Sequence, residues 1–172
     1  IYKIKLGTKD DIQIVTELRK NSNSIFRIDA NCAWTVQETL QNAIALKKLG
    51  VEFIEQPLNA DDLEGMKRLK ADCMLPLIAD ESCQRLEDVK KCAEGFHGIN
   101  IKLMKCGGIT PALDMIDKAR SHSLKIMIGC MTESSCGISV AAQLLDLVDY
   151  ADLDGAYLLQ NDPAVGVVLN NG

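Results

Sequence analysis

Apolar stretches with the period of β-strands alternate with stretches of helical period along this chain of 172 residues. Strands are predicted at 1–6, 25–30, 51–56, 75–80, 98–104, 124–129 and 149–154. Helices are predicted at 9–21, 35–49, 61–72, 85–95, 109–121 and 134–147, and a weak strand pattern follows at 164–169. Strict alternation is typical of parallel strands joined by helical crossovers. The chain is therefore predicted to be α/β, either an open doubly wound sheet or a (β/α) barrel.

Charged residues at the strand ends separate these two architectures. A parallel strand covered on both faces is expected to be almost uniformly apolar. Here the strands end in "KIKLG", "RIDAN", "FIEQP" and "IADES", and later strands carry Lys102 and "YADLDG". In a barrel the carboxyl ends of the strands converge on one face, whereas an open sheet spreads them along an edge. The pattern favours a TIM-type barrel, with one strand fewer than the usual eight.

Three acidic residues occupy equivalent places on successive strands. Asp29, Glu55 and Asp80 are separated by 26 and 25 residues, one strand–helix unit each, so their carboxylates are expected to be neighbours. Three adjacent anions repel one another unless a cation lies among them. Hard oxygen ligands suit Mg²⁺. The alternative is that each acid caps the helix that follows it.

Lysines are predicted on both sides of these acids. Lys3 and Lys5 share one face of the first strand, and Lys102 lies on the fifth. A lysine with a pKa of about 10.4 is a poor base until neighbouring positive charges lower that value. One base on each face of a substrate, with the substrate carboxylate on Mg²⁺, suits abstraction of the proton next to the carboxylate through an ene-diolate. The alternative is that Lys3 and Lys5 are solvated lysines of an edge strand.

Composition excludes other classes of function. A net charge of −5 and a pI near 5.0, without a basic stripe, predict no nucleic acid partner. No apolar run approaches the length of about 18 residues that a membrane span needs, so no membrane partner is expected. Seven scattered cysteines without a C-x-x-C pair predict free thiols and a cytoplasmic location.

The ordered motifs "KIKLG", "RIDAN", "IEQPL", "ADES" and "NIKLMKCGGI" resemble the barrel domain of the enolase superfamily, muconate-lactonising subgroup. Together with "GCMTES" and "DLDG" they are most similar to dipeptide epimerases of the L-Ala-D/L-Glu type. The resemblance implies a barrel domain over 1–155 and a C-terminal loop or tail over 156–172. It also implies that the first barrel strand and the N-terminal α+β capping domain of the family are absent from this sequence, so that the 172 residues alone are expected to epimerise poorly.

The resemblance assigns roles to particular residues. It implies Mg²⁺ on the three acids named above, general acid/base chemistry at Lys5 and Lys102, and a place for Lys3 beside the substrate carboxylate. Asp152 and Asp154 match the motif that receives the α-ammonium group of a dipeptide, and Glu133 is expected to line the pocket.

The implied activity is Mg²⁺-dependent epimerisation of a small dipeptide, and whether the protein forms a homo-oligomer is left open. Two alternatives stay open beside it. One is cycloisomerisation or o-succinylbenzoate synthesis on the same scaffold, whose substrates lack the ammonium group that Asp152 and Asp154 would bind. The other is a non-catalytic barrel that acts as a binding module, which would be indifferent to the loss of Lys102.

Overall fold

The computed structural model describes residues 1–168, which fall into two compact units. The first unit holds residues 1–82 and 92–97, and the second holds residues 83–91 and the chain from 98 onward. Helix α4 (Leu86–Gly95) is divided between them. Both units alternate strands with helices, as the periodicity predicts.

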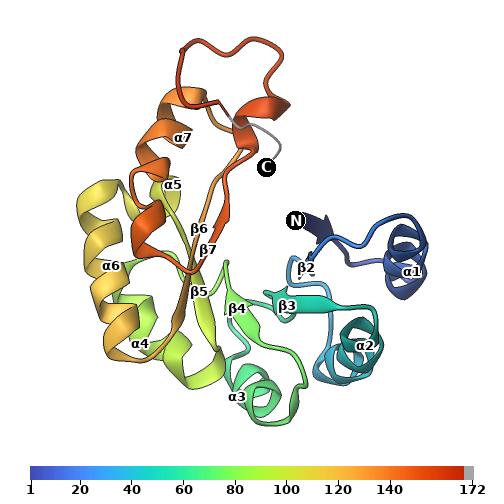
Figure 1. Cartoon of the computed structure of the whole chain (residues 1–172). Helices are drawn as coiled ribbons and strands as arrows, with labels where there is room; N and C mark the ends of the chain where they lie inside the picture. The colour runs from blue at the N-terminus through green and yellow to red at the C-terminus, as the bar shows by residue number, and fades with distance from the viewer. Residues whose placement is uncertain (169–172) are drawn as a thin grey trace. The chain divides into compact units, whose positions relative to one another are not determined.

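Four parallel strands, in the order of the chain, form the sheet of the first unit. They are β1 (Tyr2–Lys5), β2 (Phe26–Asp29), β3 (Val51–Glu55) and β4 (Leu77–Ala79). The connecting helices are α1 (Asp11–Asn21), α2 (Val36–Lys48) and α3 (Leu63–Asp72), and they flank the same face of the strands (Figure 1). Phe26, Ile28, Phe53, Ile54 and Leu69 are fully buried and belong to the core of this unit.

Local signals fix the ends of these helices. Thr35 begins α2 with a capping box, in which its side chain and that of Glu38 each bond to the other residue's main chain. Asp62 caps α3 by accepting a hydrogen bond of 2.8 Å from the N–H of Gly65. These contacts satisfy donors that the first turn of a helix otherwise leaves without partners. The strands therefore end at defined places, and this fixes the positions of the acids at their ends.

The turn after β1 is held by a buried carboxylate. Asp11 accepts hydrogen bonds from the main-chain N–H of Gly7 (3.0 Å) and Thr8 (2.8 Å) and from Nε1 of Trp34 (2.8 Å). Gly7 has a φ of +125°, and a Cβ there would lie 2.8 Å from Cβ of Ala33. The position thus requires glycine, because the turn after β1 packs closely against the loop that follows β2.

A β-bulge interrupts the pairing of β2 with β3. Phe26 pairs with Val51, but Ile28 pairs with Ile54, so β3 contains one extra residue between these pairs. Beyond the bulge the pairing is regular, and Asp29 stands opposite Glu55. On the other side of β2, Asp29 stands opposite Lys5. The charged ends of three strands therefore lie side by side at one level.

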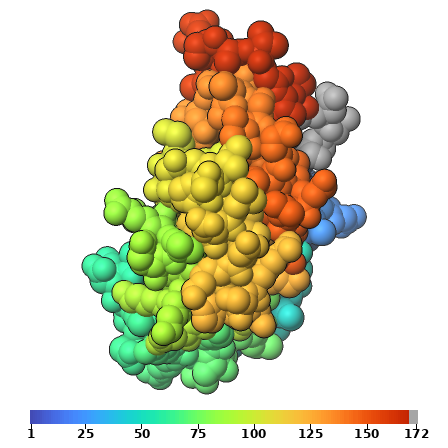
Figure 2. Space-filling view, turned by 90° about the vertical axis from the view of Figure 1, so that its left-hand side faces the viewer, coloured from blue at the N-terminus to red at the C-terminus, as the bar shows by residue number. Residues whose placement is uncertain are grey.

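The second unit has three parallel strands in the order β5, β6, β7. They are β5 (Gly98–Lys102), β6 (Lys125–Gly129) and β7 (Tyr150–Asp152). The helices are α5 (Leu103–Cys106), α6 (Ile109–Ser121) and α7 (Ser135–Ala142), with 3₁₀ turns η1 (Leu145–Leu147) and η2 (Gly155–Leu158). Helix α6 packs on β5 and β6, and its outer surface is yellow in Figure 2.

Four details of the second unit differ from the sequence predictions, and one of them is that β7 ends at Asp152 and not at residue 154. The fifth strand ends at Lys102 and passes directly into α5, so the prediction of a strand to 104 was wrong. The helix predicted at 134–147 ends at Ala142 and is followed by the separate turn η1. Residues 164–168 form no strand, and residue 169, the end of that predicted strand, lies outside the described residues. The division into 1–155 and 156–172 stays a prediction.

Candidate active site

Three buried carboxylates meet at the carboxyl ends of β2, β3 and β4. Asp29 and Glu55 are the last residues of their strands, and Asp80 directly follows β4. Ligand oxygens of all three lie within 4.8 Å of one another. Asp29 and Glu55 are fully buried, and Asp80 is 3% exposed. The prediction that these side chains are neighbours is confirmed, whereas simple helix caps would be spread among separate helix ends.

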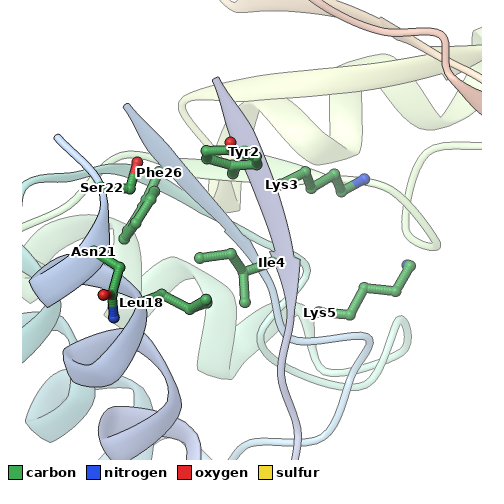
Figure 3. Close-up of a pocket in the computed structure, with 8 residues that line it drawn as sticks. All are labelled: Tyr2, Lys3, Ile4, Lys5, Leu18, Asn21, Ser22 and Phe26. Atoms are coloured by element: carbon green, nitrogen blue, oxygen red, sulfur yellow. The ribbon is translucent and has the colours of Figure 1, made fainter. Parts of the chain in front are cut away.

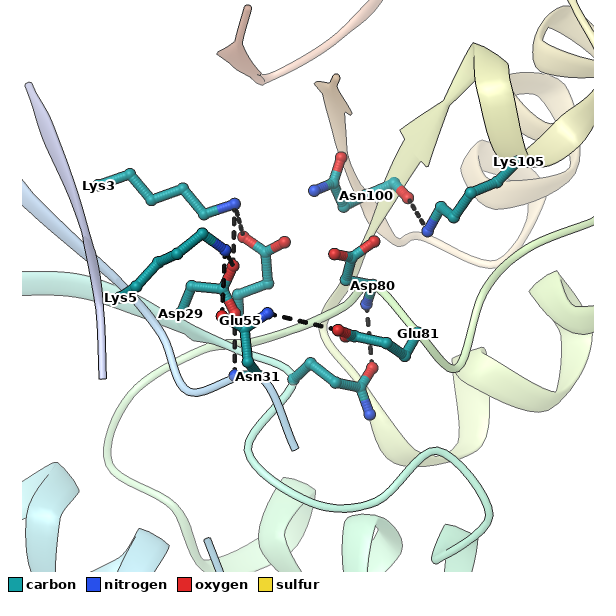
Figure 4. A network of polar contacts seen from close by, with 10 residues as sticks. Lys3, Lys5, Asp29, Asn31, Glu55, Asp80, Glu81, Asn100 and Lys105 are labelled. Carbon is teal, nitrogen blue, oxygen red and sulfur yellow. Dashed lines mark hydrogen bonds and ion pairs between the residues drawn. The ribbon is translucent and has the colours of Figure 1, made fainter. Parts of the chain in front are cut away.

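Two lysines of β1 compensate this negative charge (Figure 4). Nζ of Lys3 lies 3.2 Å from Oδ2 of Asp29 and 2.9 Å from Oε2 of Glu55. Nζ of Lys5 lies 3.0 Å from the same oxygen of Asp29 and 3.0 Å from Oδ1 of Asn31. The Lys3 side chain is 14% exposed and that of Lys5 is 67% exposed. Lys3 is therefore held among the acids, and Lys5 reaches them from the solvent side.

The alternation of β1 determines which side chains reach the acids. Lys3 and Lys5 project from one side of the strand, and Ile4 projects from the other side, toward Leu18 of α1 (Figure 3). A cavity of about 560 Å³ beside β1 is lined by residues of β1, α1, the segment after α1 and the start of β2, and the three acids are not among its lining residues. The prediction that the two lysines share one face is thus confirmed.

Asn31 and Glu81 extend this network, and the sequence analysis did not single them out. Asn31 donates its main-chain N–H to Oδ1 of Asp29 at 3.0 Å and its side-chain amide to Oε1 of Glu81 at 3.4 Å. Burial together with the charges of Glu81, Asp29 and Asp80 raises the pKa of the Cys32 thiol to about 11. The Cys32 thiol therefore stays protonated at neutral pH, and burial is the largest cause.

The chemistry of this cluster fits a hard divalent cation. Its three ligands are carboxylate oxygens, which Mg²⁺ prefers over nitrogen or sulfur, and Mg²⁺ completes its octahedron with water or substrate oxygens. The cluster is also buried, so repulsion among its charges is screened weakly by solvent. Asp29, Glu55 and Asp80 are the residues that could hold such an ion.

In the second unit the predicted site residues lie at the ends of β5 and β7. Lys102 ends β5 opposite Gly129, and Asp152 ends β7 opposite Gly129 on the other side of β6. Lys102 and Asp152 are both half-buried. The second unit thus presents a cation and an anion at one level of its sheet.

Three acids act electrostatically on the Cys130 thiol, which follows β6. Burial, together with the negative charges of Asp152, Asp154 and Glu133, raises the pKa of this thiol to about 11. Oε1 of Glu133 accepts a hydrogen bond of 3.0 Å from the N–H of Met131. The three acids, which were predicted to contact substrate, therefore all lie within electrostatic reach of one thiol, and their charges favour a cationic group nearby.

Lys105 lies in a helix and not in the loop that was expected, and its side chain bonds to the main chain. The sequence analysis predicts a strand to 104, which would leave Lys105 in a loop, but the residue belongs to α5. Its Nζ donates to the main-chain oxygens of Cys83 (3.0 Å) and Asn100 (3.4 Å). Gly107, with a φ of +96°, ends α5 in the left-handed conformation that glycine adopts without strain.

Comparisons with known proteins agree with this geometry. A family model described as "Enolase C-terminal domain-like" matches residues 1–161. An L-Ala-D/L-amino acid epimerase of Flavobacterium johnsoniae is 59% identical over 172 residues, covering 100% of this chain and 51% of that protein. Another from a Maribacter species is 62% identical over 167 residues, covering 97% of this chain and 50% of that protein.

Solved structures give the same result. The crystal structure of a dipeptide epimerase from Enterococcus faecalis, complexed with Mg and the dipeptide L-Leu-L-Tyr, matches with a TM-score of 0.92 and 37% identity, covering 97% of this chain and 50% of that one. The expected fold class, a TIM-type (β/α) barrel, is confirmed by this likeness. The chain spans about half the length of the curated relatives it matches. Among the described residues no helix combines the length and the hydropathy of a membrane span.

Proposed function

Because the chain belongs to the enolase C-terminal domain-like family, we propose that the protein is an Mg²⁺-dependent epimerase of L-Ala-D/L-Glu or a related dipeptide. The observation that carries this proposal is the cluster of Asp29, Glu55 and Asp80, buried together at three strand ends beside two lysines. Relatives named as dipeptide epimerases and a relative complexed with Mg support it. The free thiols of the seven cysteines support a cytoplasmic location as part of the same proposal.

The three acids hold Mg²⁺, which when bound supplies positive charge that acidifies the proton next to a substrate carboxylate. Lys3 contacts Asp29 and Glu55, so it limits the negative charge of the cluster and is placed to attract the same carboxylate. Lys5, whose side chain is mostly exposed, removes or returns the α-proton from one side. Lys102, at the end of β5, does the same from the other side.

Acidic residues of the second unit are proposed to bind the ammonium group of the dipeptide. Asp152, Asp154 and Glu133 all act on Cys130 electrostatically, so their negative charges add in the region that follows β6. An ammonium group next to these acids would be bound by charge and by hydrogen bonds. The proposed substrate therefore carries both a carboxylate and an ammonium group.

Isotope exchange tests this proposal. The protein, expressed from its complete reading frame, is incubated with L-Ala-L-Glu and Mg²⁺ in D₂O, and NMR follows the α-proton of the glutamate residue. Deuterium should enter at that carbon and the L,D diastereomer should accumulate. If no α-proton exchanges with any of a series of dipeptides, the proposed function is refuted.

Lysine variants sharpen the test of the two bases. A single base can exchange the α-proton of one stereoisomer but cannot invert it. Lys5→Ala and Lys102→Ala should therefore each lose epimerisation. Each variant should still exchange the α-proton of one stereoisomer, and this stereoisomer should differ between the two variants. Lys118→Met, which replaces an exposed lysine in the last turn of α6, is the matched control and should turn over normally. Identical behaviour of the two alanine variants toward both isomers would contradict the assignment.

A further inference from the structure

A buried glutamine adjoins one acid of the candidate metal site in the chain and bonds to the main chain of another. Gln56 directly follows Glu55 and is fully buried. Its φ is +35°, a left-handed conformation that a residue with a side chain rarely adopts. Backbone strain of this kind costs about 1–3 kcal/mol in general and persists only where the surroundings hold it. Its contacts show what holds this residue in place.

The side-chain amide of Gln56 makes four hydrogen bonds. Oε1 accepts from the main-chain N–H of Asp80 at 3.0 Å and of Ser82 at 3.1 Å. Nε2 donates to the carbonyl oxygen of Leu58 and to Oγ of Ser82, both at 2.9 Å. Main-chain N–H groups can only donate and a carbonyl can only accept, so these partners fix the orientation of the amide. Both ends of the amide are fully used.

The main chain of Gln56 reaches the remaining strands. Its N–H donates to the carbonyl of Ile78 in β4 at 2.9 Å, and its carbonyl accepts from the N–H of Cys32, after β2, at 2.8 Å. One residue therefore bonds to the segments that follow β2, β3 and β4. Asp29 and Glu55 directly precede the first two of these segments, and Asp80 begins the third.

We propose that Gln56 is a positioning residue that sets the distance of Asp80 from Asp29 and Glu55, and so gives the site its preference for Mg²⁺. The inference rests on the proposed function, because it concerns the same metal site. Gln56 acts through the main chain of Asp80 and through the loop of Ser82, since its amide oxygen already accepts two hydrogen bonds and is not left for a metal. Residues that orient metal ligands in this way typically contribute about 10- to 100-fold to metal affinity.

Mg²⁺ and Ca²⁺ respond differently to a displaced ligand. Mg²⁺ demands a nearly ideal octahedron, whereas Ca²⁺ accepts longer and irregular coordination. A variant that lets Asp80 move should therefore lose affinity for Mg²⁺ more than for Ca²⁺. A variant that merely populates unfolded protein lowers both affinities by the same factor.

The test measures Mg²⁺ and Ca²⁺ binding by calorimetry, and urea unfolding alongside, on the protein expressed from its complete reading frame. Gln56→Met keeps the size of the side chain and removes its four hydrogen bonds. It should raise the Kd for Mg²⁺ about 10- to 100-fold and the Kd for Ca²⁺ by a smaller factor. Ser82→Ala removes one partner of the amide and should shift the two affinities in the same sense by less.

Thr39→Val is the matched control. Thr39 is fully buried in α2, where its hydroxyl donates to the carbonyl of Thr35 at 2.8 Å, so the variant loses a buried hydrogen bond away from the acids. It should lower the free energy of unfolding and leave both metal affinities unchanged.

An unchanged Kd for Mg²⁺ in folded Gln56→Met, or equal loss for Mg²⁺ and Ca²⁺, overturns the inference. If Gln56→Met does not fold, Ser82→Ala decides, and an unchanged ratio of the two affinities is then the contrary result. A wild-type protein that binds Mg²⁺ but exchanges no α-proton would overturn the proposed function alone. A wild-type protein that binds no Mg²⁺ would overturn both.

Discussion

Replacing Lys3 with methionine tests the electrostatics of the acid cluster. Nζ of Lys3 lies within 3.2 Å of Asp29 and 2.9 Å of Glu55, and both carboxylates are fully buried. Removing one partner of a buried ion pair leaves charge without compensation and costs about 3–5 kcal/mol. Because Lys5 remains on Asp29, we expect the lower end, about 3 kcal/mol, for Lys3→Met in metal-free protein. At roughly 2–4 °C per kcal/mol for a domain of this size, the Tm should fall by about 6–12 °C.

Mg²⁺ should reduce this loss of stability, because the bound ion supplies positive charge that the variant lacks. Folding and metal binding form a thermodynamic cycle, so each 1.4 kcal/mol by which Mg²⁺ reduces the deficit must appear as about tenfold tighter Mg²⁺ binding by Lys3→Met. Urea unfolding in EDTA and in Mg²⁺ gives one side of the cycle, and calorimetric titration gives the other. The two measurements must agree.

Lys67 provides the control for Lys3. Its Nζ also bridges two carboxylates, those of Glu64 and Glu94, each at 2.9 Å, but all three side chains are substantially exposed. Water screens such pairs, so Lys67→Met should change stability little, and Mg²⁺ should not alter the result. If Lys3→Met were no more destabilised than Lys67→Met, or if its deficit were the same with and without Mg²⁺, the electrostatic reasoning would be wrong.

Two further predictions follow from displaced pKa values. Because the pKa of Cys130 rises from 9.0 to about 11, its thiolate fraction at pH 8 falls about 100-fold, and iodoacetamide should modify it that much more slowly than a thiol with a pKa of 9.0. Peptide mapping compares this rate with that of Cys130 in the urea-unfolded protein, and equal rates would contradict the shift. Burial and the charge of Lys70 lower the pKa of His97 below 6.5, and its Nδ1 accepts a hydrogen bond of 3.1 Å from the N–H of Leu77. The neutral form of His97 therefore stabilises the fold above pH 6.5. This stability is lost as the pH falls through the lower pKa of the folded state. The urea midpoint of the wild type should therefore drop on acidification below about pH 6.5, more steeply than that of His97→Asn, and parallel curves would exclude the effect.

Much of the first unit could be predicted because period and charge agree there. The strand pattern places Lys5, Asp29 and Glu55 at strand ends, and the structure pairs them in register. Repulsion among like charges then makes a cation the natural complement, and this argument needs only residue type and spacing. The roles of these residues in catalysis stay proposals.

The contacts around Gln56 could not be predicted in the same way. An uncharged amide gives no electrostatic signal, and its partners Asp80 and Ser82 are 24 and 26 residues away in the chain. The early end of β5 was missed for a different reason. Leu103 and Met104 continue the alternation of the strand, but α5 begins there, so tertiary structure overrides the local pattern.

The bulge in β3 has a consequence for chain length. Val51 and Ile54 flank the extra residue, and the pairing of Asp29 with Glu55 is set beyond it. A deletion of one residue between Val51 and Ile54 would give an unbroken ladder and still leave Glu55 opposite Asp29. An inserted residue between Ile54 and Glu55 has no such compensation, because a slip of one position turns a side chain to the opposite face. Related chains should therefore tolerate the loss of one residue between Val51 and Ile54, and not an insertion between Ile54 and Glu55.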